Sequence, residues 1–131
     1  KYKAYSNSSF GTHKDEIDVA AYTASDGKHY FLNPANKETQ TLFVADGMDY
    51  DASTMRTTKF IPLDHVNFDL AGDTELEQMD FSKAVNKIEV ITGSVIGFEN
   101  QDGRRGIMNV KISSSIYPTI QCKFQAVAKQ Q

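Results

Sequence analysis

Residues 90–127 read VITGSVIGFENQDGRRGIMNVKISSSIYPTIQCKFQAV, and this stretch decides the fold class. Its short apolar runs are split by glycines, and the Asp-Gly pair at 102–103 is favoured in tight hairpin turns. In the last run Ile120, Cys122 and Phe124 alternate with polar residues, which is typical of a strand with one wet face. The stretch therefore predicts consecutive antiparallel β-strands, and it contains no catalytic motif.

Similar β-prone segments recur at short spacing along the rest of the chain. In residues 16–23 apolar side chains take every second position, and a Ser-Asp-Gly-Lys turn separates this segment from residues 29–32. The two segments predict a hairpin. We expect further strands at residues 39–45, 59–61, 66–70, 88–92, 94–99, 107–113 and 119–128.

Helical signals are sparse. Only residues 74–87 have a pattern compatible with a helix, and a short helical turn is expected near residues 52–55. About eight strands with at most one short helix predict an all-β fold, an antiparallel β-sandwich that is immunoglobulin-like or related. A barrel is the alternative, because both architectures bury alternate residues. The length of 131 residues predicts a single domain, residues 1–131.

Composition narrows the classes of partner. The formal net charge is −3, so the chain offers no long-range attraction to nucleic acid, which is not an expected partner. No apolar run is long enough to cross a bilayer. The sequence begins at Lys1 without a methionine, which suggests a processed or trimmed form from which an export signal could have been removed. Cys122 is the single cysteine, so an intrachain disulfide is impossible.

Several short motifs occur in an order that resembles a known family. They are Ile17-Asp18-Val19, Phe31-Leu32-Asn33-Pro34, Thr58-Lys59-Phe60, residues 93–98 (GSVIGF) and residues 103–111 (GRRGIMNVK). Together they resemble the exported β-sandwich domain of uncharacterised surface or periplasmic lipoproteins of gut Bacteroidetes. The resemblance implies an exported protein at the cell surface (outer membrane) or in the periplasm, attached through a lipid-anchoring cysteine upstream of Lys1. It implies no reaction.

The glycines of these motifs have a physical explanation of their own. Gly103 is expected to adopt a positive φ in the hairpin turn, whereas Gly93, Gly97 and Gly106 are expected to permit bulges or close approach of neighbouring strands. Contact with a ligand is the alternative explanation, which we disfavour.

Carboxylates provide a possible metal site. Asp46, Asp49 and Asp51 lie within six residues of a predicted loop, and Ca²⁺ prefers several oxygen ligands from such a segment. The spacing is not that of an EF-hand, and the loop alone supplies too few ligands, so we favour a solvated turn. Residues 64–80 also hold six acids and no Lys or Arg, whereas the C-terminal third is basic. This segregation predicts either an acidic contact surface or, as we favour, solvated faces.

Catalytic signals are weaker. His13, His29 and His65 have no metalloprotease spacing and no neighbouring nucleophile motif. Cys122 alternates with Ile120 and Phe124, which favours packing over reactivity. The seventeen acids could supply a glycosidase pair, but the sequence singles none out. No catalytic residue is therefore predicted.

Tyrosines are the candidate ligand contacts. Sugar platforms depend on exposed aromatic rings, and this chain has six Tyr but no Trp. Tyr22, Tyr30, Tyr50 and Tyr117 could form a small patch, whereas tyrosines beside turns more commonly cover the end of a core.

These observations favour a non-catalytic module of an exported, surface-attached bacterial protein, serving adhesion or accessory binding of a ligand such as a glycan or a protein. The alternatives are a hydrolase acting on glycans or peptides, and a calcium-stabilised structural domain using Asp46, Asp49 and Asp51. No cofactor other than calcium is expected.

Overall fold

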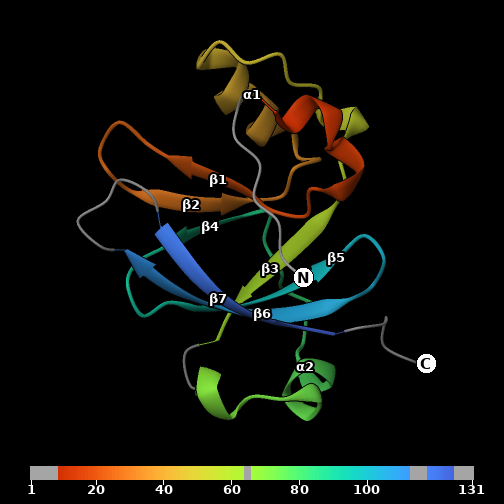
Figure 1. Ribbon diagram of the computed structural model, residues 1–131, viewed down its shortest axis with the longest axis vertical. Helices are drawn as coiled ribbons and strands as arrows, with labels where there is room; N and C mark the ends of the chain where they lie inside the picture. Colours follow the sequence, from red (N-terminus) through yellow and green to blue (C-terminus); the bar gives the residue numbers. More distant parts are fainter. Residues whose placement is uncertain (1–8, 64–65, 113–117, 126–131) are drawn as a thin grey trace.

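Two antiparallel sheets form the body of the molecule (Figure 1). The computed structural model describes residues 9–63, 66–112 and 118–125, which contain seven strands. Sheet A has the strand order β1-β2-β4, and sheet B has the order β3-β5-β6-β7. The strands are β1 (Ala20–Thr23), β2 (His29–Leu32), β3 (Thr58–Pro62), β4 (Lys87–Val90), β5 (Val95–Asn100), β6 (Arg105–Ile112) and β7 (Pro118–Phe124).

The sheets meet at one corner and do not close into a barrel. Phe60 in β3 pairs with Val85, just before β4, through backbone hydrogen bonds of 3.0 and 2.9 Å. Over the described ranges β1 and β7, which form the opposite edges, are not paired with each other. The predicted all-β antiparallel sandwich is therefore confirmed, and the barrel alternative is not.

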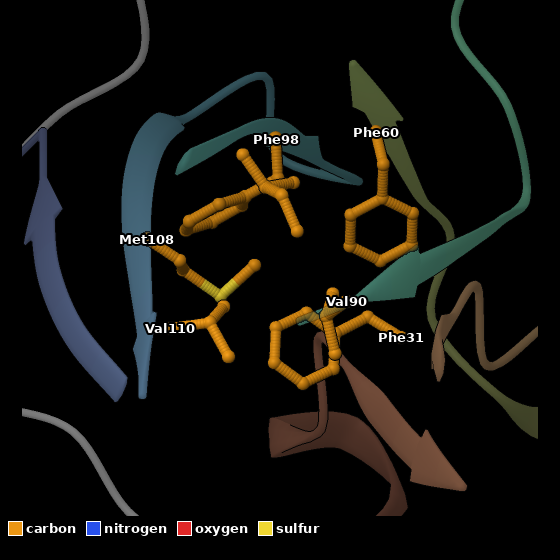
Figure 2. Packing of buried hydrophobic residues seen from close by; sticks show 7 residues of the cluster. Phe31, Phe60, Val90, Phe98, Met108 and Val110 are labelled. Atoms are coloured by element: carbon orange, nitrogen blue, oxygen red, sulfur yellow. The ribbon is translucent and has the colours of Figure 1, made fainter. Parts of the chain in front are cut away.

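The inner faces of the two sheets enclose the central core. Figure 2 shows Phe31 and Val90 from sheet A packed with residues of sheet B. Phe60 in this cluster is fully buried. Cys122 packs against the cluster as expected, whereas Ile120, two residues earlier on the same strand, is 48% exposed. The buried members are Phe31, Phe60, Val90, Ile96, Phe98, Met108 and Val110.

Short helices cover the outer face of each sheet (Figure 1). Beyond sheet A lie α1 (Lys37–Ala45) and the 3-10 turn η3 (Ala52–Thr54), and beyond sheet B lie the 3-10 turn η4 (Phe68–Leu70) and α2 (Asp73–Gln78). Two further 3-10 turns, η1 (Phe10–Thr12) and η2 (Lys14–Glu16), precede β1. The second half of β2 is consequently buried on both faces, because Phe31 faces the central core and Leu32 faces the α1 layer.

Two α-helices occur where one short helix at most was expected. The prediction of a strand at residues 39–45 is wrong, because this segment lies in α1. Thr39 and Phe43 are one helical turn apart and are both buried. The β-prone composition of the segment is overridden by packing of this one face on sheet A. The helical turn expected near residues 52–55 is confirmed as η3.

Local side-chain bonds explain two further differences. The prediction of a strand at residues 66–70 is wrong, because Asn67 accepts a hydrogen bond from the Asp69 amide and opens the turn η4. The helix expected at residues 74–87 ends at Gln78. Asp80 then accepts a hydrogen bond from the Ser82 amide, which favours a turn over continued helix.

Two cationic side chains of sheet B bind η4, α2 and the residues that follow them. Arg105 donates through Nη1 to the carbonyls of Leu76, Glu77 and Met79 at 2.9 to 3.0 Å. Lys123 donates through Nζ to the carbonyls of Phe68, Asp69 and Ala71 at 2.6 to 3.0 Å. Cations suit the carboxyl ends of helical turns, where carbonyls are otherwise unpaired. These bonds hold η4 and α2 against sheet B through main-chain carbonyls.

Glycines allow close contact at two strand positions. Gly103 has the expected positive φ of 78° in the β5–β6 hairpin. A Cβ on Gly106 would lie 2.4 Å from Cζ of Phe98 and 2.9 Å from the Lys123 carbonyl oxygen, and one on Gly97 would lie 2.5 Å from Sδ of Met79. The expectation of close approach at Gly97 and Gly106 is confirmed. For Gly93 it is wrong, because this residue lies in a turn with a φ of 93° and nothing lies within 4 Å of a Cβ added there. In the described part of the chain, no helix combines the length and apolarity that a bilayer span requires.

Candidate functional site

Three side chains line up across the outer face of sheet A. Tyr22 of β1 lies opposite Tyr30 of β2, and Tyr30 lies opposite Glu89 of β4. Directly opposed residues of antiparallel strands share a face, with Cβ atoms roughly 4.5–5.5 Å apart. Both tyrosines are half-buried and Glu89 is exposed. We call this set, Tyr22, Tyr30 and Glu89, the tyrosine row.

The layer formed by α1 supports one end of the row. The ring of Phe43 in α1 meets the ring of Tyr22 edge to face, with centroids 5.8 Å apart and planes at 86°. The next pair along the strands, Ala20 and Leu32, lies beneath the same layer, where Leu32 is fully buried. The row therefore lies at the border between the covered and the accessible part of sheet A.

A lysine lies against the middle of the row. The ammonium of Lys87 is 4.6 Å from the centroid of the Tyr30 ring, within the range of a cation–π contact. The same nitrogen lies 3.0 Å from Oε2 of Glu38 in α1. The hydrogen bond to Glu38 raises the pKa of Lys87 above its ordinary value. Lys87 is thus a cation whose charge is balanced by a carboxylate of the covering helix.

Tyr50, another tyrosine candidate, does not join this surface. Tyr50 is buried, and its hydroxyl donates a hydrogen bond of 2.6 Å to the carbonyl of Pro34. Burial raises the pKa of Tyr50 far above its ordinary range. Its ring packs against Phe10 and Phe43 inside the α1 layer. Tyr117 lies outside the described residues.

The three aspartates proposed for calcium occupy the segment after α1. Asp46 ends the helix and Asp49 is exposed. Oδ1 of Asp51 accepts bonds from the Ser53 hydroxyl at 2.7 Å and the Ser53 amide at 3.0 Å, which lower the pKa of Asp51. Over residues 9–63, 66–112 and 118–125, no three His, Cys, Asp or Glu side chains form a group suited to a metal ion.

Calcium stabilisation by this segment is the alternative named above, and it has a direct test. A specifically bound ion raises the melting temperature, so unfolding with and without millimolar calcium is informative. Because Asp51 already binds Ser53, we expect no rise. A rise that disappears in Asp49→Asn would contradict this expectation and establish the loop as a calcium site.

The histidines lie on separate elements. His13 lies between η1 and η2 and bonds Glu16 at 2.8 Å, whereas His29 lies in β2 and bonds the hydroxyl of Thr23 at 2.9 Å. His65 lies outside the described residues. The two described histidines, His13 and His29, add no catalytic group to the tyrosine row.

Sequence reasoning missed a polar network beside the β5–β6 turn. Arg56 bonds Asp18 through Nε at 2.9 Å and Asp102 through Nη2 at 2.7 Å. Asn100 also donates to Asp18, at 3.3 Å, and accepts from the amides of Asp102 and Arg104. The network links the segment before β1 to sheet B, so these charged and polar side chains stabilise the fold. No sequence signal indicates it, because its members are distant along the chain.

A buried polar cluster was missed for the same reason. Oδ1 of Asn33 accepts from the amides of Ala35 and Thr58, and its Nδ2 donates to Asn86 at 3.0 Å. The hydroxyl of Thr39 donates to the Asn33 carbonyl at 2.7 Å. These bonds fix the Asn-Pro corner that leads from β2 into α1.

Compared with known proteins, the chain matches no family, no curated protein and no solved structure. The resemblance to Bacteroidetes lipoproteins is therefore a prediction from the sequence, and the site is argued from its geometry alone.

Proposed function

We propose that this protein is a non-catalytic module of an exported, surface-attached bacterial protein, and that the tyrosine row binds its ligand, a glycan. The observation that carries the proposal is the alignment of Tyr22, Tyr30 and Glu89 on one accessible face. Aromatic rings supply a rigid apolar surface for the C–H face of a sugar, and a carboxylate accepts bonds from its hydroxyls.

Support for a non-catalytic role comes from how charged groups are used elsewhere in the described structure. Arg105 and Lys123 bind main-chain carbonyls, and Arg56 links Asp18 to Asp102. These contacts stabilise the packing of layers. Export and surface attachment rest on the resemblance to lipoproteins described above.

The proposal is tested by titrating the isotope-labelled protein with neutral and charged oligosaccharides while recording amide NMR shifts. We expect shifts concentrated on β1, β2 and β4. Tyr30→Ala should weaken binding about tenfold, because the stacking surface is lost, and Tyr30→Phe should retain most of it. Leu70→Ala is the control, since Leu70 is 80% exposed on η4 over the other sheet.

Two results would contradict the proposal. Saturating oligosaccharides that leave the tyrosine row unperturbed would remove the site. Cleavage of the oligosaccharide during the titration, followed by product analysis, would favour the hydrolase alternative. A thermal melt of each variant separates loss of binding from loss of fold.

A further inference from the structure

The charges around the tyrosine row point to one chemical class of sugar. Resting on the function proposed above, we infer that the row selects a glycan that carries a protonated amine. The inference depends on the Tyr30 ring, on the two carboxylates of Glu38 and Glu89, and on the one ammonium that already lies there.

Lys87 shows that the ring face accepts a cation. Its ammonium lies 4.6 Å from the Tyr30 centroid while it is also paired with Glu38. A cation within about 6 Å of a tyrosine ring is attracted by the negative π-face. The intramolecular contact therefore has the chemistry that a ligand amine would use on the Tyr30 ring.

Of the two carboxylates near the row, only Glu38 is paired with the lysine. Lys87 is paired with Glu38 at 3.0 Å. Within the described ranges Glu89 has no hydrogen bond or ion pair, and it is exposed beside Tyr30. Two carboxylates and one ammonium give this surface a net negative charge, which disfavours anionic sugars and favours a cationic one.

The spacing of the row allows both contacts to form together. Tyr30 and Glu89 occupy directly opposed positions, so their Cβ atoms lie roughly 4.5–5.5 Å apart. An ammonium placed over the outer part of the tyrosine ring can donate to the carboxylate while the sugar ring packs towards Tyr22. A neutral acetamide at the same position would lose both the cation–π contact and the charge pair.

The test compares two oligosaccharides of equal length, one of β-1,4-linked glucosamine and one of its N-acetylated form, below the pKa of the sugar amine. We expect the amine form to bind about three- to tenfold more tightly at the row. Glu89→Gln should abolish this preference while retaining residual stacking. Glu77→Gln, an exposed carboxylate on α2, should change nothing.

Lys87→Ala provides an independent readout. It removes the competing ammonium, so affinity for the amine oligosaccharide should rise severalfold, and weaker binding in this variant would contradict the inference. Equal binding of the two oligosaccharides would also overturn it, and would leave the proposed function intact. A lysine-containing peptide serves as a third ligand. Binding of that peptide without binding of either sugar would overturn the assignment to a glycan.

Discussion

Substitution of Gly106 by alanine tests the packing between β5 and β6 at its tightest point. Gly106 lies opposite Phe98 in register, and the Phe98 ring occupies the space above it. On the other side of Gly106, Phe124 of β7 meets the same ring edge to face, with centroids 5.2 Å apart. An added methyl group would therefore enter a region filled by two aromatic rings of the central core.

The expected cost follows from what would have to move. The new Cβ would lie 2.4 Å from Cζ of Phe98 and 2.9 Å from the Lys123 carbonyl oxygen. The ring can rotate only by disturbing Phe124, and the carbonyl belongs to the β6–β7 ladder. Overpacking of this kind costs about 1–3 kcal/mol. For a domain of this size that loss lowers the melting temperature by roughly 3–15 °C.

Chemical denaturation with the linear extrapolation method measures this loss, and the slope of the transition should stay unchanged. Gly11→Ala is the matched control, because nothing lies within 4 Å of its added Cβ. Combining Gly106→Ala with Phe98→Leu should recover part of the loss, giving a coupling energy of at least about 0.5 kcal/mol. A Gly106→Ala protein as stable as the parent, with no coupling to Phe98, would refute the proposed packing of β5 on β6.

Three other substitutions test distinct parts of the structure. The hydroxyl of Thr58 is buried without a hydrogen-bond partner in the described structure, so Thr58→Val should match or exceed the parent in stability. A loss of more than about 1 kcal/mol in the free energy of unfolding would contradict this. Arg105→Met removes the bonds to the carbonyls of α2 and Met79, so it should lower the free energy of unfolding by about 2–3 kcal/mol and speed hydrogen exchange in α2. The exposed control Lys111→Met should lower it by less than about 0.5 kcal/mol. NMR titration should give a pKa of Asp51 below its ordinary value, returning towards that value in Ser53→Ala. Because the folded-state pKa is lowered, the contribution of this carboxyl to stability is present above its ordinary pKa and is lost as the pH falls through the lowered value.

The strands that the sequence predicts correctly are those whose alternation is local. In β6, Met108 and Val110 face the central core while Ile107 faces the α2 layer. This pattern is visible without knowledge of the fold, as is the Asp-Gly turn before it. The expected ranges 94–99 and 107–113 accordingly lie within two residues of β5 and β6 at each end.

Segments whose conformation depends on tertiary contacts were predicted less well. Thr39, Leu42 and Phe43 have helical spacing, but they lie in a β-prone run. The segment is helical because these side chains pack on the outer face of sheet A, and that contact is not visible in the sequence. The prediction of a strand at residues 66–70 was wrong because the hydrogen bond that the Asp69 amide donates to the Asn67 side chain competes with a strand. Side-chain bonds of this kind are not evident from hydrophobic periodicity.

The candidate site was partly predictable. Tyr22 and Tyr30 flank one local hairpin, so the sequence could place them together. Glu89 joins them only because β4 pairs with β2, and that pairing links distant parts of the chain. Tyr50, an equal candidate in the sequence, is buried by the packing of Phe10 and Phe43, which no local pattern indicates.

The most direct measurement of the central claim is a crystal structure of the protein with a bound oligosaccharide. We predict a sugar ring packed on Tyr22 and Tyr30, with a polar group of the sugar within hydrogen-bond distance of the Glu89 carboxylate. An ordered sugar bound elsewhere on the molecule, with the tyrosine row in contact only with solvent, would contradict the account.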